Sequence, residues 1–198
     1  MIFLIATQNR HKVKEFERIL SPLGVEIKTA PELGINLPDV EETGTTFEEN
    51  AVIKAEHGCN ISGLPTLADD SGLSVDALGG APGIYSARYS SESGENADDR
   101  ANNAKLLREL ADVPSEKRTG RYVCAVACAF PGSETLVVRG ECEGRIAFEE
   151  KGTGGFGYDP LFLVGDKTFA EIPPEEKDAQ SHRSRAIHAM YELLEGRI

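Results

Sequence analysis

The chain has 198 residues, 40% hydrophobic and 27% charged, so it is long enough to bury a core and is not of disordered composition. Its formal net charge of −12 argues against an extended nucleic-acid or anionic-membrane surface, because both need a basic face. No run approaches the roughly 18 apolar residues of a membrane helix. We therefore expect neither a nucleic-acid nor a membrane partner, and the length predicts a single domain over residues 1–198.

Hydrophobic periodicity predicts alternating strands and helices, followed by a strand-rich second half. In chain order we expect a strand (2–6), a helix (10–23), a strand (25–29), a helix (46–58), strands (64–68, 73–78), a helix (98–110), strands (122–130, 135–139, 142–148, 161–164) and a closing helix from about residue 181. This order predicts an α/β fold with a mixed central sheet flanked by helices.

The loop TQNRHK lies between the first strand and the first helix. A helix N-terminus offers free backbone N–H groups and a partial positive charge, which together bind anions. Thr7, Asn9 and Lys12 add a hydroxyl, an amide and an ammonium to this loop. An ordinary capped helix with a solvated lysine explains the same residues, and both interpretations stay open.

The next polar loop, EETG, precedes a helix that carries Asn50 and Lys54. These two side chains are four residues apart and share one helix face. Lys54 is surrounded by apolar residues in the sequence, so it either has an anionic partner or extends to water. Glu41 is either a metal-binding carboxylate or an exposed loop acid.

The stretch ADDSG places Asp69 and Asp70 at the expected end of a strand, where ligands gather in open α/β sheets. Mg²⁺ takes one or two protein carboxylates together with phosphate oxygens and water, so Glu41 and Asp70 together would suit it. An Asx turn joining two strands is the alternative, and we expect a turn here in either case.

The loop GTGGFGYDP holds two aromatic residues, Phe156 and Tyr158, among glycines that let a ligand approach the backbone. An aromatic ring there either stacks on a planar base or plugs the core beside a tight turn. His182 and Arg183 lie at the start of the last helix, where positive charge is unfavourable unless an anion is bound. Lys177 lies in the preceding loop.

Acids suited to a metal, basic groups suited to phosphates and an aromatic glycine loop are together what a Mg²⁺–nucleoside triphosphate requires. The four cysteines show no CxxC spacing and lie mostly in apolar runs. Buried, reduced thiols in a cytoplasmic protein are therefore expected, with zinc binding or a disulfide framework as the alternatives.

Six segments resemble, in order, the inosine/xanthosine triphosphate pyrophosphatases, which hydrolyse non-standard purine nucleoside triphosphates: TQNRHKVKEF, EETGTTFEENAVIKA, ADDSGLSVDALGGAPGIYSARY, GENADDRANNAKLL, GTGGFGYDPLF and EEKDAQSHRSRA. The resemblance covers nearly the whole chain. It implies an enzyme with two lobes and an active-site cleft between them, Mg²⁺ dependence and a homodimer. Similar enzymes convert ITP, dITP and XTP to the monophosphate and pyrophosphate.

The resemblance also assigns roles by motif position. Asp70 resembles the catalytic general base and a metal ligand, with Glu41 as a further ligand and Asp69 as a partner in the metal site. The positions that resemble substrate-binding residues are Thr7, Gln8, Asn9, Arg10, His11, Lys12, Asn50, Lys54, Ser71, Arg88, Phe156, Gly157, Tyr158, Asp159, Lys177, His182 and Arg183.

The first loop departs from the family pattern, because Gln8 replaces the glycine of the usual T-G-N or S-G-N. We expect a β or helical backbone at residue 8, since positive φ would strain a glutamine. Two other functions remain open. A pyrophosphatase for pyrimidine or other modified nucleotides would keep the metal site, whereas a non-catalytic nucleotide-binding module would not need the acids.

Overall fold

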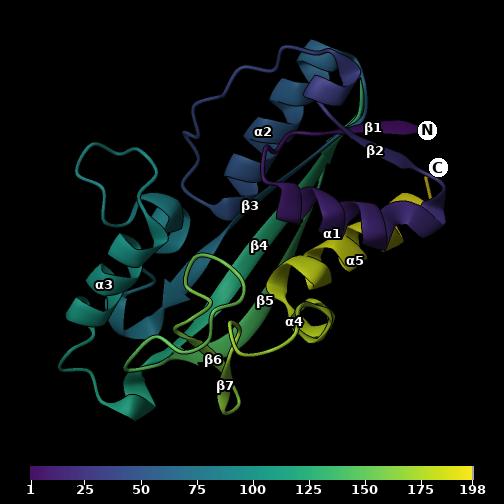
Figure 1. Ribbon diagram of the computed structural model, residues 1–198. Coiled ribbons are helices and arrows are strands. Elements are labelled where there is room, and N and C mark those ends of the chain that lie inside the picture. The colour runs from purple at the N-terminus through teal and green to yellow at the C-terminus, as the bar shows by residue number, and fades with distance from the viewer. Residues whose placement is uncertain (198) are drawn as a thin grey trace. The chain divides into compact units, whose positions relative to one another are not determined.

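The computed structural model describes residues 1–197 (Figure 1). The strands are β1 (Ile2–Ile5), β2 (Glu26–Thr29), β3 (Thr66–Val75), β4 (Thr119–Ala129), β5 (Leu136–Ile146), β6 (Phe162–Val164) and β7 (Lys167–Thr168). The helices are α1 (Arg10–Leu20), α2 (Phe47–Ser62), α3 (Asp99–Glu109), α4 (Pro174–Gln180) and α5 (His182–Glu195).

These strands form a seven-stranded sheet in the order β2-β1-β3-β4-β5-β6-β7. Strand β1 runs parallel to β2 and β3, whereas β6 runs antiparallel to β5 and β7. The prediction of an α/β fold with a mixed sheet is therefore confirmed. No helix among residues 1–197 is long and apolar enough to cross a membrane.

The described residues pack as two compact units. The first unit comprises residues 1–70, 124–140 and 182–197, and the second comprises residues 71–123 and 141–181. Each unit has its own buried hydrophobic cluster. In the first unit, α1 packs along α5 (Figure 1), and Phe16 and Met190 of these helices are fully buried. Burying a side chain of this size stabilises the fold by roughly 1.5–3 kcal/mol.

Aromatic rings dominate the core of the second unit. The Tyr122 ring lies 4.5 Å from that of Phe162, and the Phe162 ring lies 5.1 Å from that of Phe169, measured between centroids. Both pairs are tilted, an arrangement that adds favourable quadrupole contact to the area that the rings bury. The four cysteines are buried, and none forms a disulfide within the part of the chain that the structure describes.

The first two helices begin where the sequence predicts. Asn9 caps α1 by accepting hydrogen bonds from the backbone N–H groups of His11 and Lys12, and Thr46 caps α2 in the same way. Helix α2, however, passes Gly58 and ends at Gly63, which has the positive φ typical of a C-terminal cap. Gly58 serves close packing instead, because a Cβ there would lie 2.7 Å from the Thr66 side chain.

The predicted turn at ADDSG is wrong. Strand β3 continues through it from Thr66 to Val75, with both carboxylates buried. Successive side chains of a strand point to opposite faces, so Asp69 and Asp70 project to different sides of the sheet. Each finds cationic partners there, which removes the need for a solvated turn.

Two further sequence predictions are wrong. Strand β5 is continuous from Leu136 to Ile146, although Gly140 was expected to interrupt it. A Cβ at Gly140 would lie 2.3 Å from the His182 carbonyl oxygen, so this glycine lets the start of α5 approach the strand. Helix α4 occupies residues expected to form a loop, and Pro174 at its first position suits a helix start.

Candidate active site

Asp69 lies at the centre of a buried ion-pair network in the first unit. Its side chain is almost inaccessible, and Lys12 Nζ lies 2.8 Å from its Oδ2 atom. Arg183 Nε approaches the same oxygen at 3.5 Å, while Arg183 Nη1 lies 3.1 Å from Glu15 Oε2. Because α1 supplies Lys12 and Glu15 and α5 supplies Arg183, the packing of these two helices assembles the network.

This network determines the charge of Asp69. Burial disfavours the charged carboxylate, but Lys12, Arg183 and Lys54 outweigh that effect and hold the pKa of Asp69 well below its usual range. Burial disfavours the charged guanidinium of Arg183, but the carboxylates of Asp69 and Glu15 outweigh that effect and raise its pKa. Asp69 therefore stays ionised and serves as a fixed negative charge.

Asp70 has different partners and a different protonation behaviour. Lys54 Nζ donates to its Oδ1 atom at 3.0 Å, and Asn50 Nδ2 donates to its Oδ2 atom at 3.3 Å. Burial raises the pKa of Asp70, and Glu42 adds to the rise, so the neighbouring lysine only partly compensates. A carboxylate with a raised pKa is a better proton acceptor near neutral pH than an ordinary aspartate.

Lys54 is held by acids rather than reaching out to bulk water. Burial opposes its charged form, but Asp70, Asp69 and Glu42 together raise its pKa. Glu42 Oε1 lies 3.3 Å from Lys54 Nζ. The prediction that Asn50 and Lys54 share one face of α2 is confirmed, because both contact Asp70. These contacts leave a cationic group and a proton acceptor side by side.

The loop before α2 is fixed by Asn50. Its Oδ1 atom accepts a hydrogen bond from the backbone N–H of Gly44 at 2.9 Å. A Cβ at Gly44 would lie 2.6 Å from that oxygen, so only glycine fits. Asn50 therefore joins the loop of Glu41 and Glu42 to the carboxylate of Asp70.

The oxygen ligands near Lys54 suit magnesium when a phosphate is present. Within residues 1–197, no three His, Cys, Asp or Glu side chains converge as a metal site on their own. Glu42 rather than Glu41 contacts Lys54, and Glu41 is exposed. Mg²⁺ commonly takes one or two carboxylates and completes its shell with phosphate oxygens and water. These carboxylates are of the type and number that Mg²⁺ takes from a protein when phosphate oxygens and water complete its shell.

The residues before α1 form a compact capped turn. Thr7 Oγ1 accepts a hydrogen bond from the Asn9 backbone N–H at 3.2 Å. Gln8, Arg10 and His11 are exposed at this end of the helix. No residue other than glycine has positive φ among those described, so Gln8 carries no backbone strain, as the sequence predicts.

The second unit contains the glycine loop, residues 152–160, closed around Asp159. This carboxylate is buried and contacts Lys177 Nζ at 2.5 Å, the Phe156 backbone N–H at 2.9 Å and the Tyr122 hydroxyl at 3.2 Å. A Cβ at Gly155 would lie 2.0 Å from Asp159 Oδ2, so glycine is needed for this closure. The result is a pair of opposite charges with a buried carboxylate.

The two aromatic residues of this loop differ in their surroundings. Tyr158 is buried, and its hydroxyl donates to the Ser86 carbonyl oxygen at 2.8 Å. Phe156 has 37% of its surface exposed, and Lys177 Nζ lies 5.1 Å from the centre of its ring. Tyr158 is thus the core residue of this loop, and Phe156 carries the accessible ring.

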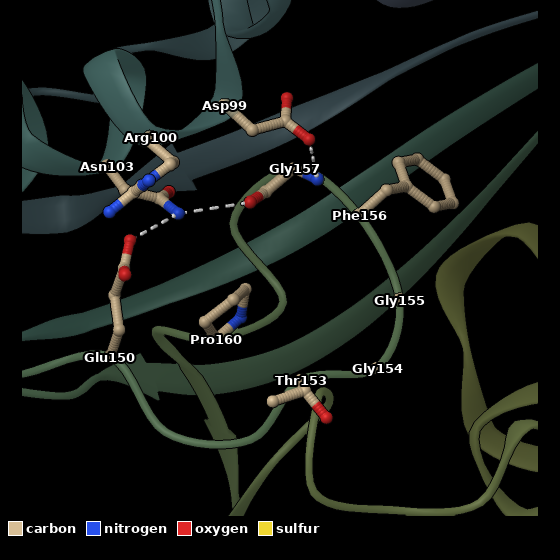
Figure 2. Close-up of a pocket in the computed structure, with 10 residues that line it drawn as sticks. All are labelled: Asp99, Arg100, Asn103, Glu150, Thr153, Gly154, Gly155, Phe156, Gly157 and Pro160. Carbon is tan, nitrogen blue, oxygen red and sulfur yellow. Dashed lines mark hydrogen bonds between the residues drawn. The ribbon is translucent and has the colours of Figure 1, made fainter.

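A pocket of about 350 Å³ lies between α3 and the glycine loop (Figure 2). Asp99 Oδ2 accepts a hydrogen bond from the Gly157 backbone N–H at 2.7 Å, and Asn103 Nδ2 donates to the Gly157 carbonyl oxygen at 3.2 Å. The residues around this pocket are Asp99, Arg100, Asn103, Glu150, Thr153, Gly154, Gly155, Phe156, Gly157 and Pro160.

Three other residues that the sequence predicts for the site lie in different surroundings. Ser71 is half-buried in β3, one residue after Asp70. Arg88 is half-buried, and its guanidinium lies 5.4 Å from the Tyr85 ring centre. His182 is buried at the first position of α5, beside Arg183.

Sequence reasoning missed five polar residues that hold the others in place: Glu15, Glu42, Asp99, Asn103 and Tyr122. Glu15 carries the only available hint, because it lies one helical turn after Lys12 and thus on the same face. The others contact their partners across 12 to 58 residues of sequence. Such pairs leave no local pattern.

The chain matches the family model described as Ham1 over residues 3–193. It is 51% identical to a dITP/XTP pyrophosphatase of Exiguobacterium sibiricum, over 98% of this chain and 97% of that protein. It is 53% identical to one of Geobacter sulfurreducens, over 96% and 95% of the two chains. The solved structure of the Staphylococcus aureus Ham1 protein superposes with a TM-score of 0.88, at 40% identity and with full coverage of both chains. The present chain therefore belongs to the Ham1 family.

Proposed function

We propose that this protein hydrolyses the non-standard purine nucleotides dITP, ITP and XTP to the monophosphate and pyrophosphate. The observation that carries the proposal is the pair of adjacent buried acids, Asp69 and Asp70, each held by a different lysine and with pKa values displaced in opposite directions. Titratable neighbours separated in this way mark acid–base chemistry. The bacterial relatives described above are named dITP/XTP pyrophosphatases, which supports the same activity here.

Asp70 is the residue that we assign to water activation. Its Oδ atoms face Lys54 and Asn50, and its raised pKa suits acceptance of a proton from the attacking water. Attack at the α-phosphorus releases pyrophosphate and leaves the nucleoside monophosphate. Hydrolysis of this kind depends on positioning and electrostatics and needs no covalent nucleophile.

Cationic side chains would stabilise the negative charge that develops on the departing pyrophosphate. The side chains of Lys12 and Lys54 are mostly buried, with 18% of each exposed, so both paired cations lie near the protein surface. The N-terminus of α1, beside Thr7 and Asn9, adds the partial positive charge of the helix dipole, which suits phosphate oxygens. Arg183 is buried against Asp69 and Glu15, which favours a positioning role for this residue.

We assign Asp70 and Glu41 to Mg²⁺, with Asp69 in support and Glu42 as a further oxygen donor in the same loop. Bound Mg²⁺ would supply Lewis-acid polarisation of the phosphate oxygens. The fit rests on oxygen-only ligands of the type that Mg²⁺ prefers and on the small number of protein carboxylates that it requires.

The nucleobase would be recognised by the glycine loop of the second unit. Phe156 offers an accessible ring for stacking, and the Asp159–Lys177 pair offers a donor that suits a 6-oxo group, which adenine lacks. Large discrimination arises when the wrong base leaves such a buried polar group unsatisfied.

The proposal also covers the organisation of the protein. It includes a single functional domain with a cleft between two lobes, a homodimer and a cytoplasmic location.

A panel of nucleoside triphosphates with pyrophosphate detection tests this proposal. We expect Mg²⁺-dependent release from dITP, ITP and XTP, with kcat/KM well above the values for ATP and GTP. Equal values for ITP and ATP contradict purine selection, and a pyrimidine preference favours a related pyrophosphatase. No release from any nucleotide, together with retained nucleotide binding, favours a non-catalytic module.

A further inference from the structure

Helix α3 holds both backbone groups of one glycine in the base-recognition loop. Asp99 Oδ2 accepts from the Gly157 N–H at 2.7 Å, and Asn103 Nδ2 donates to the Gly157 carbonyl at 3.2 Å (Figure 2). Asp99 and Asn103 are four residues apart, so one helix face presents an acceptor and a donor to the same residue. Gly157 has a φ of 62°, so its conformation is one that few other residues adopt.

The amide of Asn103 has only one orientation that satisfies its partners. Its Nδ2 atom also donates to Glu150 Oε1 at 3.0 Å, and a carbonyl and a carboxylate oxygen can only accept. Asn103 is 2% exposed, so little water competes for these hydrogen bonds. Replacing the amide nitrogen by an oxygen would oppose acceptor to acceptor at both contacts.

Gly157 lies inside the turn that places the two base-recognition groups. The Phe156 N–H donates to Asp159 Oδ2 at 2.9 Å, and the Asp159 N–H donates to the Phe156 carbonyl at 3.3 Å. Holding Gly157 therefore sets both the accessible ring of Phe156 and the carboxylate of Asp159, which also contacts Lys177 and the Tyr122 hydroxyl. A shift of about 1 Å in such groups is enough to reduce catalytic efficiency strongly.

We propose that Asp99 and Asn103 are positioning residues for nucleobase selection. They act through Gly157 and contact no substrate atom. The inference rests on the proposed function of the glycine loop, and it adds that selectivity for the base depends on hydrogen bonds from α3. Removing those bonds should raise KM and reduce selectivity, with a smaller effect on kcat.

The test compares the ratio of kcat/KM for dITP to that for dGTP in matched variants, with a melting curve for each. Asn103→Asp keeps shape and reverses polarity, and we expect its selectivity ratio to fall about tenfold through KM. Asp99→Ala should lower the ratio as well, whereas Asp99→Asn keeps an acceptor and should restore it. Asp98→Ala removes the same charge from the adjacent position and should leave the ratio unchanged.

Leu106→Ala controls for loss of stability, since this α3 residue is buried in the core of the second unit. It should lower the melting temperature without changing the ratio. An unchanged ratio in Asn103→Asp and Asp99→Ala overturns the assignment while leaving the proposed function intact. Calorimetry of dIMP binding to the wild-type protein tests the proposed function separately. A wild-type protein that neither hydrolyses dITP nor binds dIMP overturns both the proposed function and the positioning role of Asp99 and Asn103.

Discussion

Asp69 and Asp70 are adjacent in β3, yet Asp69 pairs with Lys12 on α1 and Asp70 with Lys54 on α2, at 2.8 and 3.0 Å. The alternation of side chains along a strand separates the two charges and gives each its own surroundings. Asp69 is held ionised by three cations, whereas Asp70 is destabilised as a carboxylate by its burial. One dipeptide thus supplies a fixed charge and a reactive one.

Asp70→Asn should remove most of the dITP turnover, by about 10²–10⁴-fold if this residue is the general base. The melting temperature of the metal-free protein should not fall at pH 7. Since the folded state raises the pKa of Asp70, its ionised form costs stability at pH values above that pKa, and asparagine removes the cost. The stability gained by Asp70→Asn should vanish below about pH 4, where the Asp70 carboxyl of the wild-type protein is protonated in both the folded and the unfolded state.

Pyrophosphate release and thermal melts of both proteins provide the measurement. Turnover near the wild-type rate contradicts the assignment. A fall in melting temperature of more than about 4 °C, roughly 1 kcal/mol in a chain of this size, contradicts the stability argument.

Lys12→Met should destabilise the protein by about 2 kcal/mol at neutral pH, because it removes one partner of a buried ion pair. The loss is smaller than for a fully unpaired charge, since Arg183 still contacts Asp69. The folded state lowers the pKa of Asp69, so the stabilisation is complete above about pH 4 and is lost as pH falls further.

Urea unfolding at several pH values measures this difference. Adding Asp69→Asn to Lys12→Met should recover part of the lost free energy of unfolding, because the buried carboxylate that has lost Lys12 is then neutral while Arg183 keeps Glu15 as a partner. Equal destabilisation by the single and double variants would show that the charge pair is not the cause.

Gly155→Ala should raise the KM for dITP and lower stability by more than about 1 kcal/mol, the usual cost of left-handed backbone. The added Cβ would also lie 2.0 Å from Asp159 Oδ2, which must move away from Lys177. Gly165→Ala is the matched control, because that glycine has a similar φ of 65° and open space around it. Equal effects of the two substitutions on KM would refute the proposed contact with Asp159.

Gly140→Ala should destabilise the protein by about 1–3 kcal/mol, as overpacking does, and should also reduce turnover. Its Cβ would lie 2.3 Å from the His182 carbonyl oxygen, so α5 must shift and move Arg183 from Asp69. Arg139→Ala, at the exposed neighbouring position, should cost less than about 1 kcal/mol. Chemical denaturation and dITP turnover of both variants test this, and a neutral Gly140→Ala would show that the helix contact is dispensable.

Local sequence signals were sufficient where a residue acts on its neighbours in the chain. The starts of the first two helices and the shared face of Asn50 and Lys54 follow from local pattern, because helix geometry relates residues three and four positions apart. The motif order likewise identified the family. Glycine was less reliable, since Gly58 and Gly140 mark close packing rather than ends of elements.

The sequence by itself determined the α/β class, the family and which residues carry charge or a flexible backbone, since these follow from composition, periodicity and motif order. Only the tertiary structure decided that ADDSG is a strand interior, that Glu42 contacts Lys54, and that Asp99 and Asn103 hold Gly157. The physical reason is the distance along the chain over which each effect acts. Backbone propensity acts within one helical turn or one strand, whereas burial, ion pairing and pKa depend on groups brought together from distant parts of the chain.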